Sequence, residues 1–150
     1  MNLSNTTNIP PRIMVVDDER DILSIVKRGL ESKKRFQVET FIDAESALES
    51  LKENSDNYYD LVLTDIRMPK INGFELYRRI KESTPSMKIV FITAFEINKE
   101  EFSKVIPSVD VIDFISKPVS MSTLITKLNS ILNHSPWGLR FGHGLLFLIC

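Results

Sequence analysis

The sequence contains a single cysteine, Cys150, so no internal disulfide can form, and this usage fits a reducing compartment. The net charge is only −1, which gives no global positive field for direct nucleic-acid binding. No apolar run approaches the roughly 20 residues that span a bilayer. Residues 1–11 are polar and lack the basic and apolar stretches of a secretory signal. We therefore expect a cytoplasmic protein without a membrane span.

The remaining composition is that of an ordinary folded domain. The chain has 150 residues, of which 43% are hydrophobic and 26% charged, and this length suffices for one domain with a real core. We expect a flexible N-terminal lead over residues 1–11 and one domain over 12–133. Residues 134–150 are expected to form a C-terminal tail of unknown role.

Apolar runs alternate five times with amphipathic helical patterns. Strands are predicted at Arg12–Asp17, Phe36–Phe41, Asp60–Asp65, Lys88–Thr93 and Val111–Ser116. Helices are predicted at Arg20–Ser32, at Ala44–Glu53, from Gly73 onward, at Asn98–Ile106 and at Ser120–Asn133. Strands that alternate with helices of this length indicate βαβ units, with a parallel sheet covered by helices on both faces. The predicted fold class is α/β, a three-layer (βα)5 sandwich.

Two local patterns add detail to this prediction. The alternation Phe-Gln-Val-Glu from Phe36 indicates a strand with one wetter face, as at a sheet edge. Asp43 precedes a helical pattern and is expected to cap its N-terminus.

The composition changes abruptly after Asn133. Residues 134–150 hold both histidines, the only tryptophan and the only cysteine, and they end in the apolar run Leu145–Cys150. This run is too short to span a membrane. Docking on a partner, covering a face of the domain and having no selected role remain open alternatives.

Polar residues stand at the ends of several predicted strands. Asp17 and Asp18 follow the first strand, Asp65 ends the third, Thr93 ends the fourth and Lys117 follows the fifth. In an open parallel sheet, ligands gather at the carboxyl ends of the strands. If the first and third strands are neighbours, three carboxylates converge, and such clustered oxygens suit Mg²⁺. The pattern therefore suggests a site for a divalent metal and a phosphoryl group.

The same residues suggest a reaction. A carboxylate beside a metal can act as a nucleophile and form an aspartyl phosphate. Lys117 supplies a point charge for a phosphate oxygen, and the Thr93 hydroxyl can donate a hydrogen bond to another. Transfer then depends mainly on positioning and charge neutralisation.

The chain resembles the receiver domains of two-component response regulators, in particular single-domain, chemotaxis-regulator-like ones. The resemblance covers about residues 12–133, and no single motif carries it. The matching segments are Asp17-Asp18, Thr64-Asp65-Ile66-Arg67-Met68-Pro69, Gly73 with Phe74-Glu75-Leu76, Thr93-Ala94 and Phe114-Ile115-Ser116-Lys117-Pro118.

The resemblance implies a flavodoxin-like fold with strand order 2-1-3-4-5. It implies that Asp65 accepts phosphate from a sensor histidine kinase or phosphotransfer protein, with Thr93 and Lys117 assisting. Mg²⁺ would be held by Asp17, Asp18, Asp65 and the backbone carbonyl of Arg67. It further implies a protein that catalyses only its own phosphoryl transfer and dephosphorylation, and is not a stand-alone enzyme.

Signalling in the resembled family implies a moving surface. Thr93 and Phe114 would act as the switch, repacking the face formed by helix four, strand five and helix five. An unidentified downstream protein would bind that face, and a homodimer through it is a further expectation. The sequence departs from the family pattern at Phe114, where tyrosine is common, and in having Pro107 between Thr93 and Lys117.

Other interpretations of these residues remain open. Asp17 and Asp18 are also typical helix caps, Lys117 and Arg67 also fit solvated charges, and Phe114 also fits a static core position. As a whole, the chain could be an Mg²⁺-dependent phosphatase with an aspartyl nucleophile. Arg67 argues against this, because many such enzymes place a second aspartate at that position. An interaction module that takes no phosphate and a receiver severed from a longer regulator are the remaining alternatives.

Overall fold

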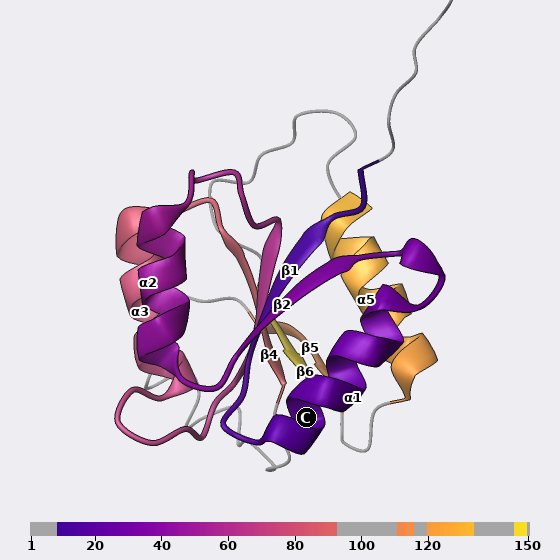
Figure 1. The fold of residues 1–150 in the computed structure, drawn as a ribbon, viewed down its shortest axis with the longest axis horizontal. Coiled ribbons are helices and arrows are strands. Elements are labelled where there is room, and N and C mark those ends of the chain that lie inside the picture. Colours follow the sequence, from indigo (N-terminus) through magenta and orange to yellow (C-terminus); the bar gives the residue numbers. More distant parts are fainter. Residues whose placement is uncertain (1–8, 93–110, 116–119, 134–145, 150) are drawn as a thin grey trace, which may run out of the picture.

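A computed structural model of the chain describes residues 9–92, 111–115, 120–133 and 146–149, the segments 111–115 and 146–149 by their backbone alone (Figure 1). Strands and helices alternate along most of the chain. The strands are β1 (Arg12–Val16), β2 (Gln37–Phe41), β3 (Leu61–Asp65), β4 (Lys88–Ile92), β5 (Val111–Ile115) and β6 (Leu146–Ile149). The helices are α1 (Arg20–Glu31), the short 3₁₀ helix η1 (Ser32–Lys34), α2 (Ala44–Glu53), α3 (Gly73–Ser83) and α5 (Met121–Asn133). The helix predicted at Asn98–Ile106 lies outside the described residues.

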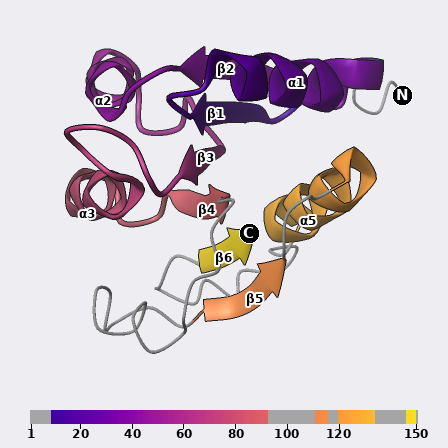
Figure 2. The same ribbon diagram turned by 90° about the horizontal axis from the view of Figure 1, so that it is seen from below.

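The strands form one six-stranded sheet in the order β2-β1-β3-β4-β6-β5, and every pair is parallel. The predicted α/β class and the order 2-1-3-4 are confirmed. Strand five does not pair directly with strand four, because β6 lies between β4 and β5 (Figure 2). Four consecutive apolar residues, 146–149, suit an inner parallel strand, but they carry no signal that selects its neighbours.

The core lies in two layers, one on each face of the sheet. Alternate residues of β1 separate into these layers: Ile13 and Val15 pack with α1 and α5, whereas Met14 and Val16 pack with α2 and α3. This separation follows from the two-residue period of a strand. Figure 1 shows α1 and α5 on one side of the sheet and α2 and α3 on the other. The described helices therefore pack on the two faces of the sheet, with α1 and α5 on one face and α2 and α3 on the other.

Local expectations for the second strand and helix hold. β2 is an edge strand in which Val38 is buried while its other residues are partly exposed. Asp43 is the N-cap of α2, and its side chain accepts a hydrogen bond from the Ser46 amide at 2.7 Å. Among the helices that the structure describes, none is long and apolar enough to cross a membrane.

Candidate metal and phosphoryl site

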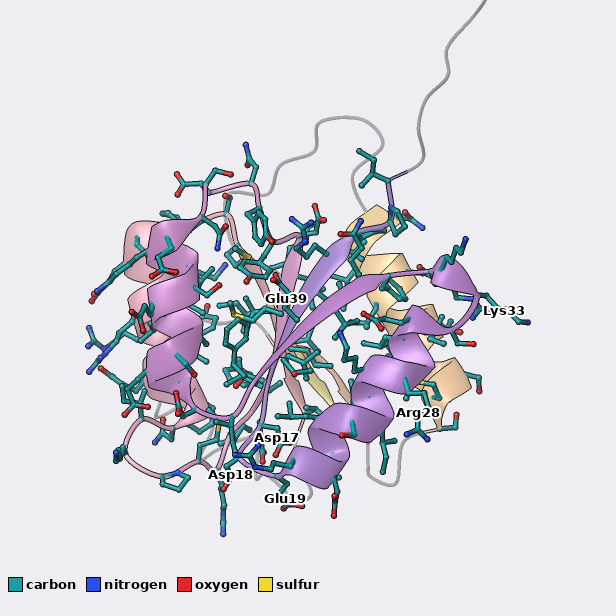
Figure 3. All side chains as sticks on the ribbon, viewed as in Figure 1. Asp17, Asp18, Glu19, Arg28, Lys33 and Glu39 are labelled. Atoms are coloured by element: carbon teal, nitrogen blue, oxygen red, sulfur yellow. The ribbon has the colours of Figure 1, made fainter. Side chains whose placement is uncertain are left out.

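Three carboxylates converge at the carboxyl ends of β1 and β3. Asp17, Asp18 and Asp65 each offer an oxygen, and these oxygens lie within 4.8 Å of one another. The cause is the parallel pairing of β1 with β3, in which Val16 is aligned with Thr64, so that Asp17 and Asp65 follow directly. Figure 3 shows Asp17 and Asp18 at the turn that leads into α1. The convergence predicted from the strand ends is thus observed.

The three side chains differ in their environments. Asp17 is buried, with 2% of its surface exposed, whereas Asp18 is exposed and Asp65 is partly exposed. Such a cluster has one buried anchor and an open side, which suits a cation that keeps some of its water. Carboxylate oxygens are also the donors that a hard divalent cation prefers. The residues present therefore fit Mg²⁺.

Hydrogen bonds fix Asp17 in place. Its Oδ1 accepts a hydrogen bond from the Glu19 amide at 2.8 Å, and its own amide donates to the Phe41 carbonyl at 3.1 Å. The first bond ties the site to the start of α1, and the second ties it to the end of β2. Glu19 is the N-cap residue of α1 and makes no side-chain capping bond. Asp18 does not occupy the cap position, so the capping alternative is not observed for it.

Asp65 ends β3 in a turn that is held from both sides. Its Oδ1 accepts a hydrogen bond from the Ile66 amide at 2.7 Å, and its carbonyl accepts one from the Thr64 hydroxyl at 2.9 Å. The Gly73 amide then donates to the Ile66 carbonyl at 2.8 Å. The acceptor candidate is therefore positioned by backbone that is itself anchored to the first residue of α3.

Gly73 permits this close approach. A Cβ atom at this position would lie 2.2 Å from the Asp65 carbonyl oxygen and 2.9 Å from the Ile66 Cα. The first distance is far below van der Waals contact, and the atoms it meets are backbone, which cannot rotate away. The sequence predicted only that a helix starts at Gly73. A glycine eight residues after a strand-end aspartate was the available signal, but the tertiary contact itself has no sequence pattern.

The loop between Ile66 and Asn72 turns tightly beside the site. Lys70 adopts a positive φ of 66°, and the Ile71 amide donates to the Pro69 carbonyl at 2.8 Å. Asn72 caps α3 by accepting a hydrogen bond from the Glu75 amide at 2.9 Å. This cap was not predicted, although Asn three residues before Glu is a recognisable start signal. Arg67 is exposed, and its predicted backbone role stays a prediction.

Electrostatics at this edge of the sheet also involve the α2 terminus. Hydrogen bonds from Ser46 hold the pKa of Asp43 below its ordinary value, and the nearby charge of Lys70 acts in the same direction. The loops after β2 and β3 therefore approach each other at the same end of the sheet as the three carboxylates.

Not every predicted site residue can be placed. Thr93 and Lys117 lie outside the described residues. Phe114 lies within β5 and is aligned with Leu148 of β6, but only its backbone is described. The structure thus brings together the three acidic residues, and the predicted roles of Thr93, Lys117 and Phe114 stay predictions.

Comparisons with known proteins agree on one family. A family model for the response regulator receiver domain matches residues 13–129. Among curated proteins, the chain is similar to "Response regulator ArlR" of Staphylococcus aureus, with 29% identity over 127 residues, 83% of this chain and 54% of that protein. The chain thus spans about half the length of the curated relatives it matches.

Two solved receiver domain structures are similar over nearly their whole length. A response regulator receiver domain protein from Clostridium thermocellum superposes with a TM-score of 0.70 at 30% identity, covering 83% of this chain and 95% of that one. A CheY-like receiver domain protein from Methanospirillum hungatei JF-1 gives a TM-score of 0.70 at 27% identity, with the same two coverages of 83% and 95%.

Proposed function

Because this chain belongs to the response regulator receiver domain family, we propose that Asp65 accepts a phosphoryl group from a phosphohistidine on a sensor kinase or phosphotransfer protein. The observation that carries this proposal is the convergence of Asp17, Asp18 and Asp65 within 4.8 Å at the carboxyl edge of the sheet. A downstream protein partner would then bind the surface that changes on phosphorylation. The family is not a classical enzyme family, and we propose that the chain is not a stand-alone enzyme.

The chemistry assigned to Asp65 is a nucleophilic displacement at phosphorus. An Asp65 carboxylate oxygen forms the new P–O bond while the P–N bond of the phosphohistidine breaks, and the imidazole leaves as a neutral ring after protonation. The Ile66 amide, which donates to Asp65 Oδ1 at 2.7 Å, orients the carboxylate. Asp17 and Asp18, together with Asp65 and the backbone carbonyl of Arg67, would hold Mg²⁺. When bound, Mg²⁺ supplies positive charge that offsets the clustered carboxylates and the incoming phosphoryl oxygens.

Other proposed elements rest on the family pattern. Lys117 would pair with a phosphoryl oxygen, and Thr93 would follow the phosphoryl group and allow Phe114 to reorient. The face formed by helix four, strand five and helix five would thereby change, and a homodimer through it is one proposed outcome. We propose no direct contact with nucleic acid, in keeping with the net charge of −1.

The central experiment measures phosphoryl transfer from acetyl phosphate in the presence of Mg²⁺, followed by intact mass spectrometry. The wild-type chain is expected to gain one phosphoryl group, and the Asp65→Asn variant is expected to gain none. Asp60→Asn is a matched control at the opposite end of β3, where Asp60 Oδ2 accepts a hydrogen bond from the Arg12 amide at 2.8 Å. A labile phosphoryl group on Asp65→Asn would contradict the assignment of the acceptor.

The metal assignment has a separate readout in thermal unfolding. A cation that binds only the folded chain raises its stability by about 2.7 kcal/mol at a hundred times its Kd. Asp18→Asn removes one carboxylate from the cluster, so we expect Mg²⁺ to stabilise this variant much less than wild type. Without Mg²⁺ the variant should be at least as stable as wild type, because the mutual repulsion of the carboxylates falls. Asp21→Asn is the control, an exposed acid in the first turn of α1 outside the cluster. An equal Mg²⁺ response in the Asp18 and Asp21 variants would refute the metal site.

A further inference from the structure

Strand β6 occupies a place in the sheet that separates β5 from β4. Its pairing with β4 is continuous, from Ile89 with Leu146 to Ile92 with Ile149. Its pairing with β5 is irregular, with a register shift between Val111 and Phe114. The boundary between β6 and β5 is thus the less regular of its two pairings.

The register connects this strand to the acceptor. Asp65 is aligned with Ile92, Ile92 with Ile149, and Ile149 with Ile115 at the end of β5. The end of β5 is therefore three strand positions from Asp65, where the order 2-1-3-4-5 would make it two. Strands lie about 4.8 Å apart, so the separation is about 14 Å in place of about 10 Å. Ile115, the last residue of β5, therefore lies one strand farther from the acceptor than it would in the order 2-1-3-4-5.

Phosphorylation would act on this arrangement through charge. A phosphoryl group on Asp65 adds negative charge, and its attraction for a cation that follows β5 strengthens as their distance falls. The arrangement with β5 directly beside β4 gives the shorter distance. A ligand shifts an equilibrium by its differential affinity for the two states, and the shift is reciprocal.

Strands β5 and β6 can each form backbone hydrogen bonds with the same edge of β4. Both run parallel to β4, and both are short and largely apolar, over Val111–Ile115 and Leu146–Ile149. Either one supplies backbone donors and acceptors for the edge of β4, which would otherwise be left unpaired. The edge of β4 is therefore hydrogen-bonded in both states, whichever of the two strands pairs with it.

We propose that β6 is an exchangeable strand that opposes phosphorylation. With β6 between β4 and β5 the chain accepts phosphate poorly. Phosphorylation of Asp65 favours the state in which β5 pairs with β4 and β6 leaves the sheet. This regulation rests on the proposed function of Asp65, while the exchange of strands itself does not.

Cys150 directly follows β6 and is the only cysteine of the chain. The rate at which its thiol is labelled is therefore used to detect whether β6 leaves the sheet. The full chain is labelled with a chromogenic disulfide reagent in Mg²⁺ alone and in Mg²⁺ with beryllofluoride, a phosphate mimic. Labelling is expected to be about 5-fold faster or more with beryllofluoride, the low end of ordinary coupling. Fluorine NMR measures beryllofluoride binding independently. Binding with unchanged labelling would overturn the regulation and leave the proposed function standing.

A variant tests the exchange without any phosphate mimic. Leu148→Lys places a charge in an inner strand and is expected to expel β6. Hydrogen exchange at the amides of Ile89–Ile92 should stay slow because β5 takes the vacated place, and phosphorylation by acetyl phosphate should become faster. Ile25→Lys is the matched control, since Ile25 is 59% exposed on α1. Fast exchange along β4 or unfolding of Leu148→Lys would show that β6 is a permanent strand and would overturn the proposal. If beryllofluoride does not bind at all, the proposed function fails, and this hydrogen exchange alone decides whether the strands exchange.

Discussion

Gly73→Ala is expected to damage the acceptor site through backbone contact alone. The φ angle of Gly73 lies outside the left-handed region, so alanine could adopt its backbone conformation. The added Cβ, however, would meet the Asp65 carbonyl oxygen at 2.2 Å, whereas ordinary contact begins at 3.4 Å. The start of α3 and the turn after β3 must therefore separate. That movement stretches the 2.8 Å hydrogen bond from the Gly73 amide to the Ile66 carbonyl.

The expected cost follows from these contacts. Overpacking typically costs about 1–3 kcal/mol, and loss of a backbone hydrogen bond adds about 1 kcal/mol. The better helix propensity of alanine offsets at most about 1 kcal/mol. We therefore expect a net loss of about 2 kcal/mol, which lowers Tm by about 4–8 °C for a chain of this size. Because the Asp65 backbone moves, phosphorylation by acetyl phosphate should also slow.

Gly29→Ala provides the matched control. Its Cβ would lie 2.4 Å from Met121 Cε and 2.6 Å from Met121 Sδ, which belong to a flexible side chain. Met121 can rotate away, and the interior of α1 gains helix propensity, so this variant should stay within about 1 kcal/mol of wild type. Urea unfolding followed by circular dichroism measures both variants. If Gly73→Ala proved as stable as Gly29→Ala, the steric explanation of Gly73 would be wrong.

Two further predictions concern carboxylates outside the cluster. Asp43→Ala should lose about 1 kcal/mol by removing the cap on the Ser46 amide, and Asp43→Asn, which keeps an acceptor, should lose less in the same urea assay. The pKa of Asp43 is lowered in the folded chain, so its charge contributes fully to the free energy of unfolding above pH 3.8 and contributes less as the pH falls. The stability of Asp43→Asn should lack this pH dependence. Hydrogen bonds from Arg78 and Arg79 lower the pKa of Glu75 to about 2, so its contribution should vanish between pH 4.5 and about 2. In Glu75→Gln, Tm should therefore depend less on pH over that range than in wild type. A pH profile of Tm unchanged from wild type would contradict the pairing of Glu75 with the two arginines.

The acid cluster was predictable because it depends on strand ends alone. Once β1 and β3 are neighbours in a parallel sheet, their register brings Asp17 and Asp65 together without any further information. The Asp43 cap was predictable for a similar reason, since capping is a local property of a few residues. Such features are predictable because the local sequence and the strand register determine their geometry.

Features that depend on which elements meet were not predictable. The place of β6 between β4 and β5 depends on pairing across distant parts of the chain, and an apolar run such as Leu146–Ile149 suits many partners. The role of Gly73 depends on how closely α3 approaches the turn after Asp65, which no spacing encodes. The start of α1 was placed correctly at Arg20, but Glu19 and not an aspartate stands at its cap.

The distribution of buried polar residues gives an independent reason to assign function to the end of β3. In the part of the chain whose side chains the structure describes, the buried polar residues are Asp17, at 2% exposure, and Thr64, at 0%. Both adjoin Asp65: one oxygen of Asp17 lies within 4.8 Å of it, and the Thr64 hydroxyl donates to its carbonyl at 2.9 Å. Burying such groups is costly even when they are hydrogen-bonded, and an apolar residue at either position would pack the core without that cost. Buried polar groups that occur together at one place in a fold are therefore expected to mark its functional site.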